Sequence, residues 1–554
     1  MLNRWATEGY WQGIASLYMK SHSCLGIGYA QGPGFSRSRG PSRRAVLALC
    51  WKVFCVFFSA ASLARAGGWG EAVAEIVELE SGVKAIPEKN TCWSATGNGC
   101  RVARIEFDDH AQWRVRVDGK PVSAYDDVTR FLFSADGSAY AHMASRRLRD
   151  FYVINGEEAP AFKELYTFVF SSDGKHHGYL ASTNRILVMI IDGEAQSSPA
   201  GWIPWKAPPV FSPDGSKVAW LEAEVERARW RTPGRGQMRM VVNGKREPAF
   251  ESCGEQRVFS TARSRLAYPV FEKGKAFFVV DGKKHPEFNA VGIDFVFSPD
   301  GKHNAYFAST REGRVLVVDG AVKARIEGNL DHMLDFSPDS HRLLYGVMKA
   351  DQSCYIVVDD QKGPVYESIG AGGPPPGVTA EPTVCALFSP DSKRVAYLAR
   401  KDERFLIVVD GVEGKVRFDS VIGFFGMDRE GKIRGPSGPG GPMQRGGLMF
   451  SPDSRRVAFV ADTGDHAKQF VIVDDQKQRE YPGVSRPSFS PDGKHLAYTA
   501  FAKDRNSMTV IVDGIERERY DAVVVPPVYK DDGILEFIAL KGEKLFKVRV
   551  RDSL

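Results

Sequence analysis

The chain has 554 residues, of which 43% are hydrophobic and 26% are charged. This length exceeds what one ordinary core supports, so several domains or an array of repeats are expected. Of the 74 Lys and Arg and the 68 acids, residues 1–66 hold eight bases and one acid, which leaves 66 bases and 67 acids over residues 67–554. This near-neutral balance gives no indication of nucleic-acid binding through a basic face, and we expect no nucleic-acid partner.

Residues 1–66 form a leader that ends in a secretory signal. Ser42-Arg43-Arg44 supplies a basic start, a mostly apolar run follows, and Ala64-Arg65-Ala66 fits a cleavage site. We predict a signal peptide at residues 43–66 and a periplasmic or secreted protein with no stable membrane span after cleavage. The alternative is an uncut segment that anchors the chain in a membrane, although Lys52 interrupts its apolar run.

Residues 67–554 consist of repeats, of which Phe489–Gly514 is the clearest. Its two apolar runs, His495–Ala500 and Met508–Val512, are bounded by the turn sequences Pro491-Asp492-Gly493 and Asp513-Gly514. Proline fixes φ at a turn position and glycine accepts positive φ, so both sequences predict tight turns. Short runs rich in Val, Ile and Tyr between such turns predict strands.

The repeat recurs along the chain with a period of about 40 residues. An F-S-x-D element begins at eight phenylalanines, and a degenerate copy begins at Phe259; the eight are Phe133, Phe170, Phe211, Phe297, Phe336, Phe388, Phe450 and Phe489. A hydrophobic-Asp/Asn-Gly/Asp element follows each copy. We expect the repeated aromatic residues, such as Phe297 with Tyr306 and Phe489 with Tyr498, to pack between neighbouring sheets.

The sequence FSPDGKHLAY, which begins at Phe489, resembles the WD-repeat-like propeller repeat of the TolB type, found in bacterial envelope proteins and in the propellers of prolyl-oligopeptidase-like enzymes. The resemblance covers roughly residues 90 to 550. It implies an all-β fold, a β-propeller of ten or eleven four-stranded repeats of about 40 residues each. Because typical rings have fewer blades, we favour two tandem propellers divided near residues 371–383, with one large ring as the alternative.

A propeller ring is commonly closed by a blade that both chain ends complete, which removes an exposed sheet edge. The last repeat, over residues 529–551, lacks a fourth strand, and Ala74–Ile86 alternates like a spare one. We therefore predict that Ala74–Ile86 pairs with the last blade.

Three insertions lengthen the connections between strands. Residues 222–238 extend a loop between second and third strands, and residues 371–383 and 424–447 are assigned to connections between a fourth strand and the next first strand. Because variable loops on a rigid scaffold carry much of protein recognition, we predict a binding face on these insertions. Its candidate residues are Trp220, Trp230, Arg231, Met427, Arg429, Arg434 and Arg445.

The sequence shows no catalytic motif and no metal or cofactor signature. The repeated Asp of S-P-D-G falls once per blade, so we interpret it as a turn cap rather than a calcium ligand. We interpret His176, His303, His341 and His495 as exposed residues beside the turns. Cys92 and Cys100 are the best disulfide candidates, followed by Cys354 and Cys385.

The main functional hypothesis is an exported, non-catalytic binding or scaffold module for protein, peptide or envelope-glycan partners. The alternative is a propeller enzyme, a lyase or lactonase-like hydrolase, with its site at the central channel. The inward ends of the first strands discriminate between them, since an enzyme of that class needs converging acids or histidines there. These positions are mixed: Thr129-Arg130, Tyr166-Thr167, Pro208-Pro209, Gln256-Arg257, Ile293-Asp294, His332-Met333 and Arg486-Pro487.

Overall fold

The structure is a computed structural model. It describes residues 73–81, 91–95, 101–107, 112–147, 149–183, 186–224, 236–370, 386–421, 426–427, 433–434, 448–465, 467–503 and 507–551. Within these ranges every regular element is a strand, and no helix long and apolar enough to cross a membrane occurs. The leader and its predicted signal peptide lie outside the described residues.

The strands form eleven antiparallel sheets, each with four strand positions, which confirms the propeller prediction. We number them blade 1 to blade 11 in chain order. Blades 1 to 4 consist of β2 (Thr91–Ala95), β3 (Val102–Phe107), β4 (Trp113–Val117) and β5 (Lys120–Tyr125); β6 (Asp127–Phe133), β7 (Tyr140–Arg146), β8 (Arg149–Ile154) and β9 (Glu157–Glu158); β10 (Glu164–Phe170), β11 (His177–Thr183), β12 (Ile186–Ile191) and β13 (Glu194–Gln196); and β14 (Trp202–Pro204), β15 (Val210–Phe211), β16 (Val218–Glu224), β17 (Met238–Val242) and β18 (Lys245–Phe250).

The middle of the chain repeats this plan. Blades 5 to 8 consist of β19 (Ser252–Cys253), β20 (Val258–Phe259), β21 (Leu266–Glu272), β22 (Lys275–Val280) and β23 (Lys283–Lys284); β24 (Ala290–Phe297), β25 (Asn304–Thr310), β26 (Gly313–Val318) and β27 (Ala321–Ile326); β28 (Asn329–Phe336), β29 (Leu343–Met348), β30 (Cys354–Val358) and β31 (Gln361–Lys362); and β32 (Ser368–Ile369), β33 (Ala386–Phe388), β34 (Val395–Lys401), β35 (Arg404–Val409) and β36 (Val412–Glu413).

The last three blades use both ends of the described chain. Blades 9 to 11 consist of β37 (Ser420–Val421), β40 (Met449–Phe450), β41 (Val457–Asp462), β42 (Gln469–Val473) and β43 (Gln476–Lys477); β44 (Ser488–Phe489), β45 (Leu496–Phe501), β46 (Met508–Val512) and β47 (Ile515–Tyr520); and β48 (Ala522–Tyr529), β49 (Leu535–Lys541) and β50 (Lys544–Arg551) with β1 (Val73–Ser81). A separate two-stranded hairpin consists of β38 (Gly426–Met427) and β39 (Ile433–Arg434).

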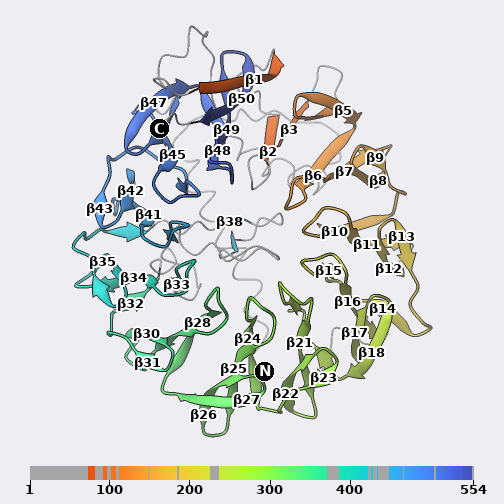
Figure 1. Ribbon diagram of the computed structural model, residues 1–554. Helices are drawn as coiled ribbons and strands as arrows, with labels where there is room; N and C mark the ends of the chain where they lie inside the picture. The colour runs from red at the N-terminus through yellow and green to blue at the C-terminus, as the bar shows by residue number, and fades with distance from the viewer. Residues whose placement is uncertain are drawn as a thin grey trace, which may run out of the picture. The chain divides into compact units, whose positions relative to one another are not determined.

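The blades form one closed ring (Figure 1). Eleven hydrophobic clusters each join two successive blades, and one of them joins Val102 of blade 1 to Ile538 and Leu545 of blade 11. The expectation of two tandem propellers is therefore wrong, and its alternative of one large ring is confirmed. The reason is that each blade has two apolar faces, and a neighbouring blade covers each of them. The outer faces of blades 1 and 11 are covered only when these two blades pack on each other.

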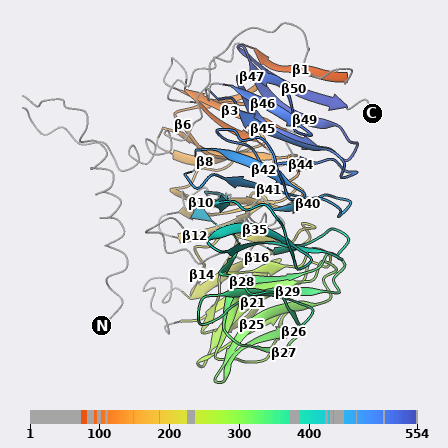
Figure 2. The same ribbon diagram turned by 90° about the vertical axis from the view of Figure 1, so that its left-hand side faces the viewer.

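The two ends of the described chain close the ring as predicted. Strand β1 pairs antiparallel with β50, from Val73 opposite Arg551 to Ser81 opposite Lys544. Figures 1 and 2 both show β1 beside β50, although they are far apart in the sequence. The predicted pairing of Ala74–Ile86 is confirmed for its described part, and the added strand covers the outer edge of β50.

Repeated aromatic rings fill the interfaces between blades. Tyr306 is fully buried, with its ring centre 4.8 Å from that of Phe278 in the preceding blade. Tyr498 occupies the corresponding place in blade 10 and is 1% exposed. Such tilted aromatic pairs add to the free energy gained from burial, and the predicted packing role of these residues is confirmed.

The S-P-D-G element forms the predicted turn. In blade 10, Gly493 has φ +74°, and Asp492 Oδ1 accepts hydrogen bonds from the Ser490 hydroxyl and the Lys494 N–H at 2.6 and 3.1 Å. The Ser490 hydroxyl is the main cause that lowers the pKa of Asp492, to about 2. The aspartate therefore caps the turn, as its sequence pattern indicates.

A second contact ties the turns of one blade together and reaches the next blade. Arg342 Nε donates to Asp359 of its own blade at 2.7 Å, and its Nη1 donates to the carbonyls of Ser392 and Lys393 in the next blade, both at 2.9 Å. His176, His303 and His495 take the place of this arginine and hydrogen-bond to the turn aspartates Asp192, Asp319 and Asp513 at 2.7–2.8 Å. These three histidines lie beside the turns as interpreted, with side chains 44%, 48% and 20% exposed, and each also joins two turns of its blade.

Candidate functional site

The first strand of each blade lies nearest the centre of the ring (Figure 1), and in ten of the eleven blades its pairing with the second strand is interrupted. In blade 3, Tyr166 and Thr167 together stand opposite Leu180 alone. In blade 6, residues 292–294 stand opposite Phe307 alone. We call these interruptions the inner belt; its described residues are 130–131, 166–167, 205–209, 254–257, 292–294, 331–333, 370, 426–427, 433–434, 448, 485–487 and 526–527.

The inner belt coincides with the positions that the sequence analysis singled out for the inward ends of the first strands. Arg130, Arg257 and Arg486 all lie in it. A bulge releases residues from the regular ladder and redirects their side chains, and bulges are common beside functional sites. The repeated interruption at one level of the ring therefore marks the candidate site.

The first strands of blades 8 and 9 are each divided into two separate short strands. Strands β32 and β33 both pair with β34, and β37 and β40 both pair with β41. Residues 371–383 and 424–447 therefore interrupt first strands, and their assignment to connections between fourth and first strands is wrong. In Figure 1, β38 lies inside the outline of the ring. The parts of these first strands that precede the insertions, β32 and β37, are only two residues long. Such short strands give no recognisable pattern in the sequence.

The predicted binding residues are not brought together. Trp220 is 2% exposed and packs between blades 3 and 4, so its placement on a binding face is wrong. The reason is that β16 is covered on both sides by neighbouring blades. Five of the predicted residues lie outside the described part of the chain: Trp230, Arg231, Arg429, Arg445 and Cys100. Three others belong to strands for which only the backbone is described, namely Met427 in β38, Arg434 in β39 and Cys92 in β2.

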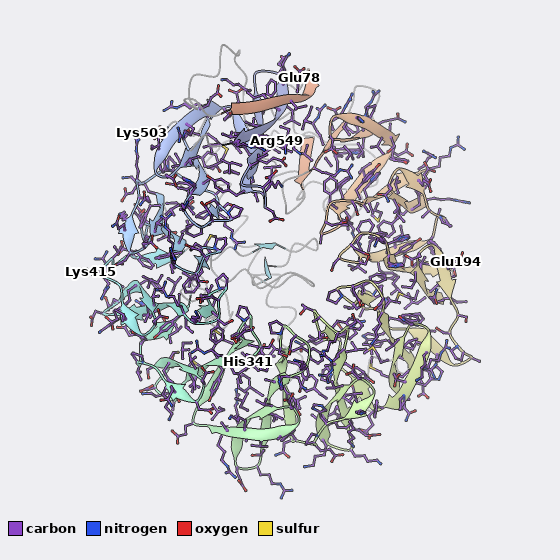
Figure 3. All side chains as sticks on the ribbon, in the orientation of Figure 1. Glu78, Glu194, His341, Lys415, Lys503 and Arg549 are labelled. Atoms are coloured by element: carbon purple, nitrogen blue, oxygen red, sulfur yellow. The ribbon has the colours of Figure 1, made fainter. Side chains whose placement is uncertain are left out.

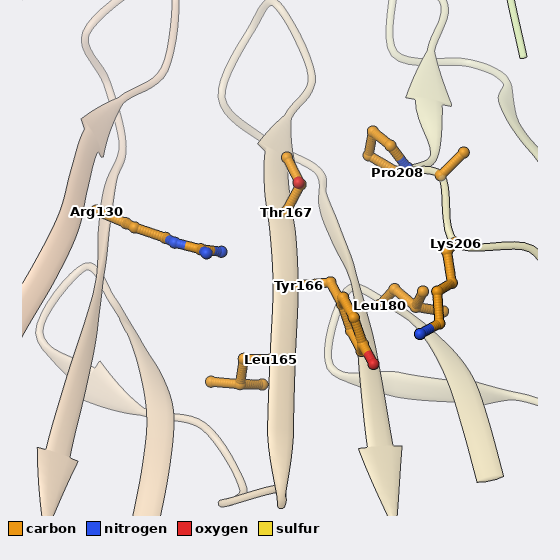
Figure 4. Close-up of a pocket in the computed structure, with 8 residues that line it drawn as sticks. Arg130, Leu165, Tyr166, Thr167, Leu180, Lys206 and Pro208 are labelled. Carbon is orange, nitrogen blue, oxygen red and sulfur yellow. The ribbon is translucent and has the colours of Figure 1, made fainter. Parts of the chain in front are cut away.

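A pocket of about 140 Å³ lies in the inner belt across blades 2, 3 and 4 (Figure 4). Arg130 extends toward it from blade 2, Tyr166 and Thr167 belong to blade 3, and Lys206 extends from blade 4. The other lining residues are Leu165, Leu180, Ala207 and Pro208. The pocket thus combines two cations, a hydroxyl group and an apolar wall.

Lys206 and Tyr166 contact each other at the pocket. Lys206 Nζ lies 5.5 Å from the centre of the Tyr166 ring, within the range of a cation–π contact. The Tyr166 hydroxyl donates to Glu164 Oε2 at 2.7 Å. Burial and then this carboxylate raise the pKa of Tyr166 to about 12, so the phenol remains neutral at physiological pH. Sequence reasoning missed Lys206, although the Pro-Pro pair that follows it at 208–209 signals an interrupted strand.

Two further arginines of the inner belt are poorly satisfied. Arg257 Nε donates to the Glu255 carbonyl at 3.1 Å, but its buried Nη1 has no acceptor among the described residues. Burial lowers the pKa of Arg257 to about 10 and also lowers the pKa of Arg486. The described part of the belt holds three acids, Glu255, Asp294 and Asp331, in addition to these cations. No group of three His, Cys, Asp or Glu that could hold a metal ion occurs among the described residues.

His142 lies directly opposite the interruption of blade 2 and is fully buried. Its ring stacks on Phe131 at 5.7 Å, and both ring nitrogens are buried without a hydrogen-bond partner among the described residues. Burial lowers the pKa of His142 from 6.5 to about 4. The ring is therefore neutral in the folded protein at physiological pH.

This burial predicts a loss of stability on acidification. Between pH 6.5 and 4 the unfolded chain binds a proton at His142 and the folded chain does not, so stability falls as pH falls, by about 2 kcal/mol at pH 5. Urea denaturation at pH 7 and pH 5 should show this loss in the wild type, and His142→Phe should remove about that amount of it. Equal pH dependence in the two proteins would contradict the assignment of His142 as the titrating group.

The interruption of blade 9 predicts that its insertion is dispensable for folding. Deleting residues 424–447 leaves three residues opposite Phe459 and Val460, the same arrangement that blade 10 has at residues 485–487. A shorter loop also has a smaller entropic cost of closure, so the urea midpoint should be unchanged or slightly higher. Deleting 424–448 instead removes the buried Leu448 and should lower the midpoint. A lower midpoint for the shorter deletion would show that the insertion is packed.

Comparisons with known proteins give only distant likenesses. No protein-family model and no curated protein match the chain. Similar solved structures include a eukaryotic initiation factor, with 10% identity and a TM-score of 0.34 over 83% of this chain and 98% of that one. Oligogalacturonate lyase in complex with manganese has 13% identity and a TM-score of 0.29 over 61% and 97%. TolB from Acinetobacter baumannii has 15% identity and a TM-score of 0.18 over 49% and 66%.

These identities and scores are low, and the assignment of fold rests on the eleven sheets themselves. The chain is an eleven-bladed β-propeller. Propellers host unrelated activities, so its function has to be argued from the inner belt.

Proposed function

We propose that this protein is an exported bacterial binding or scaffold module that holds a protein partner at its inner belt. The observation that carries the proposal is the interruption of ten innermost strands at one level, two of them by long insertions. Binding segments on a rigid scaffold are a common arrangement for recognition. The cationic, hydroxyl and apolar side chains of the pocket are of the kinds that fix and orient a bound group.

Site-specific photo-crosslinking tests this proposal. A benzoylphenylalanine residue is placed at Thr167 in the inner belt or, as the control, at Glu194, which lies at the outer rim (Figure 3). Both proteins are exposed to envelope extract at equal folded concentration and irradiated. The proposal expects a discrete crosslinked protein from position 167 and not from position 194. Crosslinks from position 194 alone, or from neither position, would contradict it.

The enzyme alternative, a lyase or lactonase-like hydrolase, has its own readout. Metal analysis of the purified protein that finds one bound divalent ion per chain, lost together with a hydrolytic or lyase activity on chelation, would favour the enzyme over the binding module. For a binding module we expect partner capture to survive chelation.

Export is supported by the sequence of the leader and by the resemblance of the repeat to the TolB type. The expected mature N-terminus is Gly67, because cleavage follows Ala64-Arg65-Ala66. N-terminal sequencing of the protein recovered from the periplasm or the medium checks this. A mature form that retains residue 1 would favour the uncut membrane anchor.

A further inference from the structure

The cations of the pocket carry charge that the described protein does not neutralise. Arg130 and Lys206 lie on opposite sides of the pocket, and neither forms an ion pair within the described ranges (Figure 4). Two carboxylates that contact Tyr166 or the neighbour of Lys206 have other partners: Glu164 accepts from the Tyr166 hydroxyl, and Glu255 accepts from Trp205 Nε1 at 2.7 Å. The pocket therefore presents two positive charges to whatever enters it.

The backbone at Arg130 is strained, in the bulge that interrupts the first strand of blade 2. Its φ of +54° lies in the left-handed region, which a residue with a long side chain rarely adopts. Glycine would occupy this bulge without strain. Strained residues cluster at functional sites, and Arg130 is the one residue of the pocket lining with a positive φ.

Shape and size restrict the occupant. The wall of the pocket is made of Leu165, Leu180, Ala207 and Pro208, and its volume of about 140 Å³ suits one side chain with an aliphatic stem and an anionic end. A sugar ring would stack on an aromatic face, but Lys206 lies over the ring of Tyr166. These features favour a peptide side chain over a pyranose.

We propose that the pocket binds a Glu or Asp side chain from an acidic segment of a protein partner. The carboxylate lies between Arg130 and Lys206, the Thr167 hydroxyl donates to it, and the stem packs on the apolar wall. This inference rests on the proposed function, since it assumes that the partner is held at the inner belt.

The test is calorimetric titration of the full chain with an acetylated, amidated hexaglutamate peptide at low salt. We expect hexaglutamate to bind saturably. The affinity for hexaglutamine should be at least tenfold lower, and hexalysine should not bind. Arg130→Gly and Lys206→Gln should each weaken hexaglutamate binding at least tenfold. Arg130→Gly should also keep or raise the melting temperature, because it relieves the positive φ.

Two control variants match these changes outside the pocket. Arg147 has φ +52° in the same blade and is exposed, and Lys245 is an exposed lysine of blade 4. Arg147→Gly and Lys245→Gln should leave hexaglutamate binding within twofold of wild type. Equal binding by all four variants, or no binding of hexaglutamate, would overturn the inference.

Two further results separate this inference from the proposed function. A uronic-acid hexamer that binds more tightly than hexaglutamate, with the same dependence on Arg130 and Lys206, would make the occupant a glycan and overturn the peptide assignment. Crosslinking of a partner from Thr167 that is unchanged in Arg130→Gly and Lys206→Gln would refute the acidic pocket while the binding module stands. Loss of crosslinking in these two variants alone would support both.

Discussion

Replacing Glu222 by Gln should lower the free energy of unfolding by about 3–5 kcal/mol. Glu222 is 0% exposed, and its Oε2 accepts hydrogen bonds from Arg239 Nε and Nη2 at 2.9 and 2.6 Å. Arg246 and Ser198 also contact this carboxylate, at 3.4 and 2.8 Å. Removing the one anion leaves two arginines close together in a poorly hydrated site, which costs more than the lost hydrogen bonds alone.

The urea midpoint measures this effect. Glu312→Gln is the matched control, because the pair of Glu312 with Arg325 is largely exposed and should contribute less than about 1 kcal/mol. A double variant, Glu222→Leu with Arg239→Met, should recover part of the loss, since a paired apolar replacement leaves fewer uncompensated charges. A midpoint for Glu222→Gln that matches the control would contradict the buried network.

Replacing Gly493 by Val should destabilise the protein by about 2–4 kcal/mol, for two separable reasons. The residue has φ +74°, where a β-branched side chain is strained by about 1–3 kcal/mol. An added Cβ would also lie 2.4 Å from Asp453 Oδ1 in the preceding blade, so the Asp453 side chain must shift from its place in its own turn.

Gly533 provides the control for the steric part. It has φ +78° in the equivalent turn of blade 11, but an added Cβ there meets nothing within 4 Å. Gly533→Val should therefore show the strain without the clash, and its urea midpoint should fall less than that of Gly493→Val. Equal shifts would contradict the steric part of the prediction, because they would mean that Asp453 moves aside at no measurable cost.

The turns and the closing strand could be predicted from the sequence because they depend on local chemistry. Asp513-Gly514 adopts φ values of 52° and 78°, the conformation that a type I′ hairpin turn demands of its two residues. The unpaired strand at each end of the array likewise predicts the closure of β1 on β50.

The number of blades in the ring could not be predicted in the same way. The number of blades depends on the angle between successive sheets, which contacts such as Tyr306 on Phe278 determine. No single repeat specifies how many of these angles complete a ring. The burial of Trp220 escaped prediction for a related reason. Strand β16 has neighbouring blades on both sides, so its buried residues do not alternate with exposed ones.

The inner belt was only partly predictable. The repeat pattern indicates Arg130, Tyr166 and Arg257 as inward positions, but not the fact that each lies in an interruption of its strand. Lys206 lies in a wide interruption, where Pro204 and Val210 pair with residues that are three apart on β16. Bringing Arg130 and Lys206 to one pocket requires the packing of three blades, which sequence periodicity does not contain.

An electron cryo-microscopy map of the protein crosslinked to its captured partner tests the central claim most directly. The account predicts one closed ring of eleven blades, with the partner's density on the inner belt beside blades 2 to 4. Two separate rings, or partner density only on the outer strands of the blades, would contradict it.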